Sequence, residues 1–357
     1  WDYKMAFVFI DSFDHYEYNS LDDKWTSKTF GPGSTVASIG ATIGRNGTAG
    51  IHMKGPNDDV PQLSKTLPFA RKTLFVGFAF KVGEYGDLSY EQIWQLVNIN
   101  TAKVSYVLES DGTIGIWRGE QVIDDFLGRT TCPLHQGCWY YLEFQNTIDT
   151  TSGYIEVRVN GRTEFTFAGN TLLAGSDAAN RVIFGGVSAA QILGNPHTFT
   201  LDDFYVLDNT GSYNNTFLGD IRIEALFPNS DGTVQWAVST VGANYQMVDE
   251  TLPNSDQDYT ETSSPGNRDR FHMTDMAVNS AYIFGIYTLL ETRKNNAGDR
   301  TIRPVITTNG STYVGSNVNI NTDYQYWDQI WEQNPVQATS WSIADVNSFQ
   351  IGYELVS

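Results

Sequence analysis

The stretch from Trp139 to Asp208 decides the fold, because it contains the segments WYYLEF (139–144), GYIEVRVNGRTEFTF (153–167), RVIFGG (181–186) and FTLDDFYVLD (199–208). Apolar and polar side chains alternate in the second segment. Ile155 and Val157 share one face of an extended chain, and Phe165 shares a face with Phe167. A period of two is typical of strands with one buried face. The segment therefore predicts a β-hairpin flanked by other half-buried strands.

The turn of this hairpin decides which side chains face the core. A two-residue turn at Asn160-Gly161 would place Val157 opposite Glu164 and drive charges inward. A three-residue loop with Gly161 in the left-handed region instead places all four apolar side chains on one face. We therefore expect the three-residue loop.

Two further hairpins follow from the same reasoning about register. The segment YVLESDGTIGIW predicts a three-residue loop with Leu108 opposite Ile114. The segment TIRPVITTNGSTYVG predicts a two-residue turn at Asn309-Gly310, with Ile306 opposite Tyr313.

These hairpins, the aromatic strand before the first of them and the closing LDDFYVLD resemble the concanavalin A-like, laminin G-like jelly roll. The resemblance covers roughly the first 210 residues. The rest of the chain, from DIRIEAL to the final FQIGYEL, also has strand patterns and no long helix. The sequence predicts an all-β protein with two β-sandwich domains. The first is a concanavalin A-like jelly roll over 1–210, and the second is a β-sandwich-like anchoring or oligomerisation domain over 211–357.

The second half resembles a module that recurs in structural proteins of tailed bacteriophages. The matching segments include GDIRIEALFPNSDGTVQW, VDETLPNSDQDY, NRDRF, RTIRP and WEQNPVQATSWSIADVNSFQIGYE. They keep the order of the motifs over most of Phe217 to Glu354, and the module often follows a concanavalin A-like domain. The resemblance implies a virion protein whose partners are other virion proteins, and it supplies no catalytic residues.

The composition argues against two classes of partner. The formal net charge is −19, with 22 Lys and Arg against 41 Asp and Glu. Such a chain repels a polyanion, and the sequence has no run of basic residues, so we expect no nucleic-acid partner. No window approaches about 18 uninterrupted apolar residues, so we expect no membrane insertion.

The first residues predict the route of synthesis. The apolar run Ala6 to Ile10 is short for a signal-peptide core, and no small-residue cleavage site follows it. We expect no signal peptide, synthesis in a host cytoplasm and a final location in the virion. Met5 is a candidate natural start, with Trp1 to Lys4 upstream of it.

Two cysteines, Cys132 and Cys138, flank His135 in TTCPLHQGCWY. A small disulfide loop and a reduced pair are both compatible with this spacing. Three potential ligands fall short of the four-ligand pattern of a zinc site. We expect no metal and no cofactor.

A glycosidase reading needs two carboxylates at a defined separation. Related glucanases of the concanavalin A-like fold carry theirs as Glu-x-Asp-x-x-Glu on one strand, and no such run occurs. Glu143 and Glu156 are isolated on their strands, while Asp202 and Asp203 point to opposite faces. The histidines do not accompany a Gly-x-Ser-x-Gly elbow. We therefore expect no catalytic residues and no enzymatic activity.

Sugar binding is the next alternative. If Leu142 and Phe144 face the core, the opposite face of the strand pair exposes aromatic, acidic and basic side chains, which can stack on and orient a sugar ring. The competing interpretation is that this face meets another sheet edge, domain or subunit. The candidate glycan-binding residues are Trp139, Tyr141, Glu143, Glu156 and Arg158.

The second domain contains a polar segment, Asn229 to Asp269, that is long for a connection within a compact sandwich. We expect a partner to order it. Aromatic residues gather toward the C-terminus and predict an interface, although they can instead close the sandwich of their own domain. A closed homo-oligomer, a dimer or trimer, is the expected assembly. The interface candidates are Tyr324, Tyr326, Trp327, Trp331 and Trp341.

Taken together, these features predict a non-catalytic structural component of a bacteriophage virion, displayed on the particle surface as a capsid decoration or tail-associated protein. The alternative is a lectin-like module that binds host-surface glycans for attachment. A glycoside hydrolase is the third reading.

Overall fold

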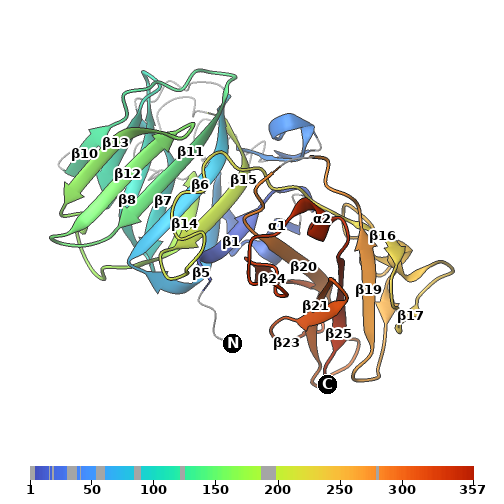
Figure 1. The fold of residues 1–357 in the computed structure, drawn as a ribbon. Helices are drawn as coiled ribbons and strands as arrows, with labels where there is room; N and C mark the ends of the chain where they lie inside the picture. The colour runs from blue at the N-terminus through green and yellow to red at the C-terminus, as the bar shows by residue number, and fades with distance from the viewer. Residues whose placement is uncertain are drawn as a thin grey trace. The chain divides into compact units, whose positions relative to one another are not determined.

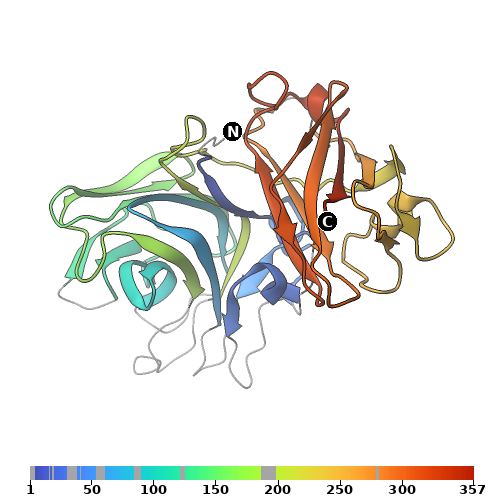
Figure 2. The same cartoon turned by 90° about the horizontal axis from the view of Figure 1, so that it is seen from below.

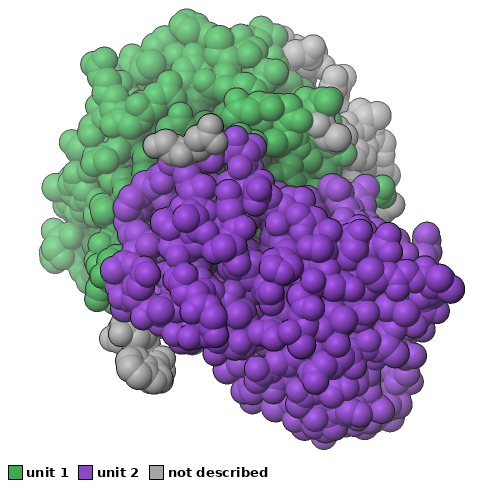
Figure 3. Space-filling view, turned by 45° about the vertical axis from the view of Figure 1, so that its right-hand side comes forward, with its two compact units in different colours: residues 1–223 green, residues 224–357 purple. Residues whose placement is uncertain are grey.

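The structure is a computed structural model that describes residues 5–15, 17, 20–29, 38–40, 42–53, 61–83, 90–120, 125–185, 198–278 and 281–357 (Figure 1). The upstream residues Trp1 to Lys4 lie outside these ranges. The chain divides into two compact units, residues 1–223 and 224–357 (Figure 3). The boundary between the units lies about a dozen residues after the one expected near residue 211, because segment 209–223 packs on unit 1.

Unit 1 contains two antiparallel sheets. Sheet A has the spatial order β13 (Arg162–Gly169), β12 (Gly153–Val159), β11 (Trp139–Thr147), β6 (Thr73–Val82), β15 (Phe199–Asp208), β4 (Ile51–Met53) and β3 (Ser38–Ile39), and β1 (Phe7–Asp11) also pairs with β15. Sheet B has the order β10 (Phe126–Arg129), β9 (Ile114–Arg118), β8 (Thr101–Glu109), β7 (Tyr90–Asn98), β14 (Ala179–Gly185), β5 (Gln62–Arg71) and β2 (Ser27–Thr29). The described part of unit 1 also includes the short helical pieces α1 (Leu21–Lys24) and η2 (Arg45–Gly47). Figure 2 shows the curvature of these strands.

The core of unit 1 lies between sheets A and B and is rich in aromatic rings. Phe78 on β6 has its ring centroid 5.1 Å from that of Phe184 on β14 and 5.6 Å from that of Phe144 on β11. Trp94 on β7 stacks on Tyr106 of β8 at 4.6 Å and contacts Phe144 edge-on at 4.8 Å. Each ring removes a large apolar area from water, and the edge-on contacts add to that gain. The predicted all-β, jelly-roll sandwich is confirmed.

The turn between β12 and β13 corrects the predicted loop. Val159 pairs with Arg162, so Asn160 and Gly161 form a two-residue turn. Their φ values are +50° and +77°, the signature of a type I′ turn, which suits the twist of a hairpin. The left-handed Gly161 is confirmed, and the three-residue loop is wrong.

A β-bulge explains why the apolar residues still share a face. Val157 lies opposite Phe165 and Ile155 opposite Phe167, as expected, although the turn has only two residues. The extra residue, Glu164, sits in β13 where the register shifts. The structure restores the register within the strand, whereas the sequence analysis placed the correction in the loop.

The other two hairpins agree with prediction. Leu108 pairs with Ile114 across the β8–β9 turn. Ile306 pairs with Tyr313 across the β21–β22 turn, where Asn309 also has a positive φ.

Unit 2 is built around sheet C. Its order is β16 (Pro228–Asp231), β19 (Arg268–Met273), β25 (Gln350–Leu355), β21 (Thr301–Thr308) and β22 (Ser311–Val314), and β23 (Val318–Asn319) also pairs with β21. Two strand pairs accompany it, β20 (Ile286–Thr292) with β24 (Gln325–Trp331) and β17 (Ala237–Val238) with β18 (Thr260–Glu261). The short helices are η4 (Asn244–Met247) and α2 (Ile343–Val346).

One face of sheet C carries the core of unit 2. Ile306 and Ile351 join a cluster with Trp341 and Phe349, and Ile302 joins a second cluster in which Leu290 and Trp327 take part. The β20–β24 pair therefore packs on this face, and the opposite face of sheet C carries a different set of side chains.

The polar segment 229–269 is folded within unit 2. The buried carboxylate of Asp269 accepts hydrogen bonds from the backbone N–H groups of Gln235 and Trp236, at 2.6 and 2.9 Å, and from the amide of Asn244 at 2.9 Å. Asp231 accepts a bond from the N–H of Tyr245 at 2.7 Å. These internal bonds give the segment its shape, so a partner is not needed to account for its order.

The described residues also bear on the expectations about membrane-spanning helices and about the two cysteines. In the described ranges, no helix has the length and hydropathy needed to span a bilayer. Cys132 and Cys138 are both free thiols.

The type I′ turn gives a stability prediction. We expect Gly161→Val to lower the free energy of unfolding by about 1–2 kcal/mol, because a β-branched side chain clashes with its own backbone at positive φ. No described atom lies within 4 Å of the position of a Cβ there, so the loss comes from conformation and not from crowding. Denaturant unfolding measures the effect. Gly161→Asn is the control, since asparagine tolerates this region, and equal losses in both variants would contradict the explanation.

Candidate functional site

The predicted glycan-binding residues lie on the outer face of sheet A, and segment 209–223 covers that face. Phe217, Leu218 and Ile221 of the segment pack on a cluster that includes Tyr141. Tyr141 is 1% exposed and Glu143 is fully buried. The side chains that sequence analysis placed in solvent are therefore held inside unit 1.

Polar contacts fix these residues under the segment. The Oε1 atom of Glu143 accepts hydrogen bonds from the Tyr205 hydroxyl at 2.7 Å and from the Gly219 N–H at 2.8 Å. Arg158 donates to Glu156 at 2.7 Å. The expected exposure is wrong for Tyr141 and Glu143, because the chain that leaves β15 folds back over them. It is also wrong for Glu156, which is 8% exposed and accepts hydrogen bonds from Tyr154, Arg158 and Thr163 of its own hairpin.

The remaining two candidates are half-buried. Trp139 packs against the same cluster, and the Arg158 guanidinium lies 4.0 Å from the centroid of the Phe217 ring. A glycan-binding role for the five residues stays a prediction. The contacts of four of them, all except Glu156, belong to the cluster on which segment 209–223 packs.

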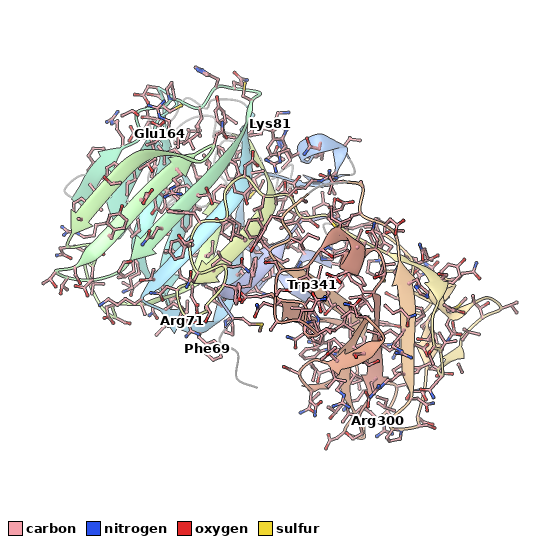
Figure 4. All side chains as sticks on the ribbon, in the orientation of Figure 1. Phe69, Arg71, Lys81, Glu164, Arg300 and Trp341 are labelled. Atoms are coloured by element: carbon pink, nitrogen blue, oxygen red, sulfur yellow. The ribbon has the colours of Figure 1, made fainter. Side chains whose placement is uncertain are left out.

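The interface candidates are distributed over unit 2. Trp341, labelled in Figure 4, is buried in the core, and Trp331 packs on the same cluster. Trp327 packs on the second cluster, whereas Tyr324 and Tyr326 are half-buried. The three tryptophans thus serve their own unit, which was the alternative interpretation, and contact with another chain stays a prediction.

The outer face of sheet B carries a different group of side chains. Along β8, Tyr106 and Leu108 point into the core, so the alternation of the strand places Ser105, Val107 and Glu109 on the outer face. Glu109 ends β8, and its position brings it next to the outer face of β9 and β10.

A compact group, which we call the Glu109 cluster, forms there from Glu109, Asp111, Trp117, Phe126 and Arg129. Trp117 on β9 pairs with Phe126 on β10, and their ring centroids are 4.8 Å apart. The Arg129 guanidinium lies 5.5 Å from the Phe126 ring centroid. A bulge in β10 between Phe126 and Arg129 turns both side chains to this face, although they are three residues apart.

Gly115 makes room for the carboxylate in this cluster. It lies opposite Arg129 on the neighbouring strand. A Cβ at this position would be 2.3 Å from the Oε1 atom of Glu109 and 3.2 Å from the Nε1 atom of Trp117. Glu109 therefore lies flat over a strand that has no side chain beneath it, and this close approach requires glycine.

Arg129 joins the two carboxylates of the cluster. Its Nη1 atom lies 3.9 Å from the Oε2 atom of Glu109 and 3.5 Å from the Oδ2 atom of Asp111. The Glu109 side chain is 7% exposed, whereas that of Asp111 is 55% exposed. The Oε1 atom of Glu109 is buried and accepts no hydrogen bond within the described ranges.

The surroundings push the pKa values of the two carboxyl groups in opposite directions. Burial raises the pKa of Glu109, and Asp111 adds to the rise while Arg129 opposes it. Hydrogen bonds from the hydroxyl and N–H of Thr113, at 2.6 and 2.9 Å, lower the pKa of Asp111. Carboxyl groups whose pKa values are driven apart occur at many acid–base catalytic sites and also in structural ion pairs.

The same face continues with polar side chains across β7 and β14. Gln92 donates to the carbonyl of Gly185 at 2.8 Å. Arg181 donates to the hydroxyl of Ser64 at 2.8 Å, and its Nε atom is buried with no hydrogen-bond partner among the described residues. Polar groups therefore extend from the Glu109 cluster over the middle of sheet B.

The described residues contain no group of three or more His, Cys, Asp or Glu side chains placed to hold a metal ion.

Comparison with known proteins gives similarity of fold only. No family model matches the sequence, and no curated protein matches it. Several solved structures are similar. A sialidase is 16% identical with a TM-score of 0.42, over 58% of this chain and 19% of the sialidase chain. An endo-β-1,4-glucuronan lyase from the fungus Trichoderma reesei is 11% identical with a TM-score of 0.42, over 57% of this chain and 95% of the lyase.

A third similar structure is a conserved carbohydrate esterase from the Shiga toxin-encoding bacteriophage phi24B. It is 13% identical with a TM-score of 0.40, over 56% of this chain and 99% of the esterase. At this level of identity the similarity concerns the fold and assigns no residues.

These findings contradict two predictions made from the sequence. We expected a non-catalytic structural protein of a virion, whereas the names of the similar structures describe carbohydrate-active proteins. The expected absence of enzymatic activity is contradicted for the same reason. The alternative reading, a chain that binds glycans, agrees better with them.

Sequence analysis missed the Glu109 cluster although a signal was present. Glu109 and Asp111 stand two residues apart in YVLESDGTIGIW, with Glu109 at the end of β8 and Asp111 in the turn that follows it. The sequence analysis uses this segment only for its hairpin register and assigns no role to its acids. Arg129 and Phe126 lie on a separate strand, so their approach to Glu109 follows only from the pairing of β9 with β10.

The buried carboxyl group gives a pH-dependent stability prediction. A raised pKa in the folded state favours the protonated form, so this contribution to stability is present at low pH and is lost as pH rises through the folded pKa. We expect Glu109→Gln to raise the melting temperature relative to the parent protein at pH 8 and to leave it nearly unchanged at pH 4. Thermal unfolding across this range measures the difference. A gain that is the same at both pH values would contradict the assignment of burial as the cause.

Proposed function

We propose that unit 1 binds carbohydrate on the outer face of sheet B, at the Glu109 cluster. The observation that carries the proposal is the combination of a half-exposed Phe126 ring, 38% exposed, with Arg129 and a buried carboxyl group beside it. An aromatic ring offers an apolar surface to the C–H face of a sugar, and flanking charged groups bond its hydroxyls.

The arrangement of the cluster favours a bound sugar over a structural role. Phe126 and Arg129 lie on β10, the edge strand of sheet B, and Glu109 keeps a buried oxygen without a partner in the described ranges. A buried acceptor that receives no hydrogen bond destabilises the folded protein by about 1–3 kcal/mol. A ligand hydroxyl that reached this oxygen would supply the missing donor.

A second candidate function is acid–base catalysis on the bound glycan. The carboxylate oxygens of Glu109 and Asp111 both lie within 4 Å of one Arg129 nitrogen. These two oxygens are therefore at most about 7.4 Å apart, which does not exceed the largest separations found in glycoside hydrolases, about 9.5 Å. The raised pKa of Glu109 suits a proton donor, and the lowered pKa of Asp111 suits a group that stays ionised.

Binding is tested first, with the full chain on a glycan array that carries neutral and uronate-containing oligosaccharides, followed by calorimetry. We expect Phe126→Ala to weaken binding about five- to tenfold, or about 1–1.4 kcal/mol. Phe69→Ala is the matched control, since Phe69 is 61% exposed and Arg71 lies 4.9 Å from its ring on the distant strand β5 (Figure 4). Failure to bind any glycan, or equal losses in the two variants, contradicts the proposal.

Catalysis is tested separately with a glycan found to bind. If Glu109 transfers a proton, Glu109→Gln abolishes the release of reducing ends while the affinity for the glycan falls less than threefold. Asp111→Asn is expected to slow release by at least 100-fold, in line with the loss of a general base. Glu143→Gln serves as the control, because Glu143 is buried under segment 209–223. Release that survives Glu109→Gln limits the cluster to binding.

The location of the protein, its natural ligands and its partners are part of the proposal. The order of the phage-like motifs in the second half supports a location on a phage particle, with host-surface glycans as the ligands and other virion proteins or a second copy of the chain as partners. Mass spectrometry of purified particles tests the location, and sedimentation of the purified chain tests the homo-oligomer.

A further inference from the structure

The face of sheet C that points away from the core of unit 2 carries an unusual share of its positive charge. Residues 224–357 contain sixteen Asp and Glu against six Lys and Arg. Three of these six, Arg268, Arg270 and Arg303, lie on β19 and β21, the two strands that flank β25, with their side chains on this one face.

The register of the strands places the three arginines in rows. Arg268 on β19, Glu354 on β25 and Arg303 on β21 lie side by side across the sheet. Arg270 stands two residues further along β19, next to Gly352. The core residues of these strands, such as Ile306 and Ile351, alternate with this set and therefore face the other way.

Glu354 holds two of the guanidinium groups in place. Its carboxylate accepts hydrogen bonds from the Nε atom of Arg268 at 2.6 Å and from the Nη2 atom of Arg303 at 2.9 Å. These arginine side chains stay 33% and 25% exposed, while the Glu354 side chain is 7% exposed. One carboxylate thus orients two guanidinium groups and leaves N–H donors of both free to meet a second anion.

Arg270 is fixed without a carboxylate. Its Nη1 atom donates to the hydroxyls of Thr307 and Thr312, at 2.9 and 3.0 Å, and its Nη2 atom donates to Thr233 at 2.7 Å. No ion pair of the described residues neutralises it. The three arginines and Glu354 therefore carry a formal charge of +2 in a unit whose other residues are strongly acidic, and their side chains are held in position.

We propose that this face of sheet C binds the carboxylate groups of an acidic polysaccharide. The guanidinium forks match carboxylates, and the neighbouring side chains of Gln350 and His272, 3.1 Å apart, offer hydrogen bonds to sugar hydroxyls. This site lies on a different unit from the Glu109 cluster and does not depend on the function proposed for that cluster.

Charge density argues for a polysaccharide and against a nucleic acid. Duplex DNA carries about one negative charge per 1.7 Å, and proteins that bind it commonly neutralise about six to ten phosphates. Three arginines, two of which share one glutamate, neutralise far fewer, and the acidic remainder of the unit repels a dense polyanion. A polymer with one carboxylate per sugar is a better match to a small patch.

The test uses the full-length protein and the probe polygalacturonate, with dextran as the neutral polymer and a 20-base-pair DNA duplex as the nucleic acid. Affinity electrophoresis and calorimetry at low salt measure binding. We expect retention on polygalacturonate that weakens as salt is added, no retention on dextran and weaker binding to DNA. No retention on polygalacturonate, or tighter binding to DNA, overturns the proposal.

Substitutions locate the site. Arg303→Gln and Arg268→Gln each leave Glu354 one arginine partner, and each is expected to weaken polygalacturonate binding at least fivefold. Arg303→Lys keeps the charge without the fork and is expected to give an intermediate loss. Arg300→Gln is the control of equal charge change, since Arg300 lies outside the strand at the end of a loop (Figure 4).

Two outcomes contradict the assignment to sheet C. An equal loss in Arg300→Gln would mean that only net charge matters. A loss with Phe126→Ala but not with Arg303→Gln or Arg268→Gln would place the polymer on unit 1. Melting temperatures of all variants, measured alongside, separate lost binding from lost folding.

Discussion

The alternation of side chains along each strand is the constraint on which this molecule depends. A sheet has two faces, and every strand supplies side chains to both. In unit 1 the inner faces of sheets A and B share one aromatic core. Each outer face must therefore either be covered by another part of the chain or carry polar side chains. Sheet A is covered by the chain itself, through Phe217, Leu218 and Ile221. Sheet B presents polar groups instead, and the candidate site is found there.

This difference explains how much the sequence could predict. Period two in segments such as GYIEVRV identified the strands, their buried faces and the left-handed Gly161. The same pattern could not say what covers an outer face, because Trp139 and Glu143 have the same alternation whether water or segment 209–223 lies above them. A bulge at Glu164 was equally invisible, since a bulge and a longer loop restore the same register.

The two charged sites could not be predicted from the sequence, for a different reason. Glu109 and Arg129 are twenty residues apart, and Arg268 and Arg303 are further apart still, so neither forms a run of like residues. Each group is assembled by strand pairing, β9 with β10 in one case and β19, β25 and β21 in the other. A chain with a net charge of −19 can therefore carry a local basic face that its composition does not reveal.

The two sites handle buried charge in opposite ways. Glu354 is buried between two arginines, whose hydrogen bonds lower its pKa against the effect of burial, so it stays ionised and orients its partners. Glu109 is buried beside a single arginine at 3.9 Å, with one oxygen lacking a partner in the described ranges, and its pKa is raised. A paired carboxylate rigidifies a surface, whereas a poorly paired one is poised to change its protonation or to receive a donor from a ligand. The first arrangement suits a platform for binding anions, and the second suits a group that acts on a bound sugar.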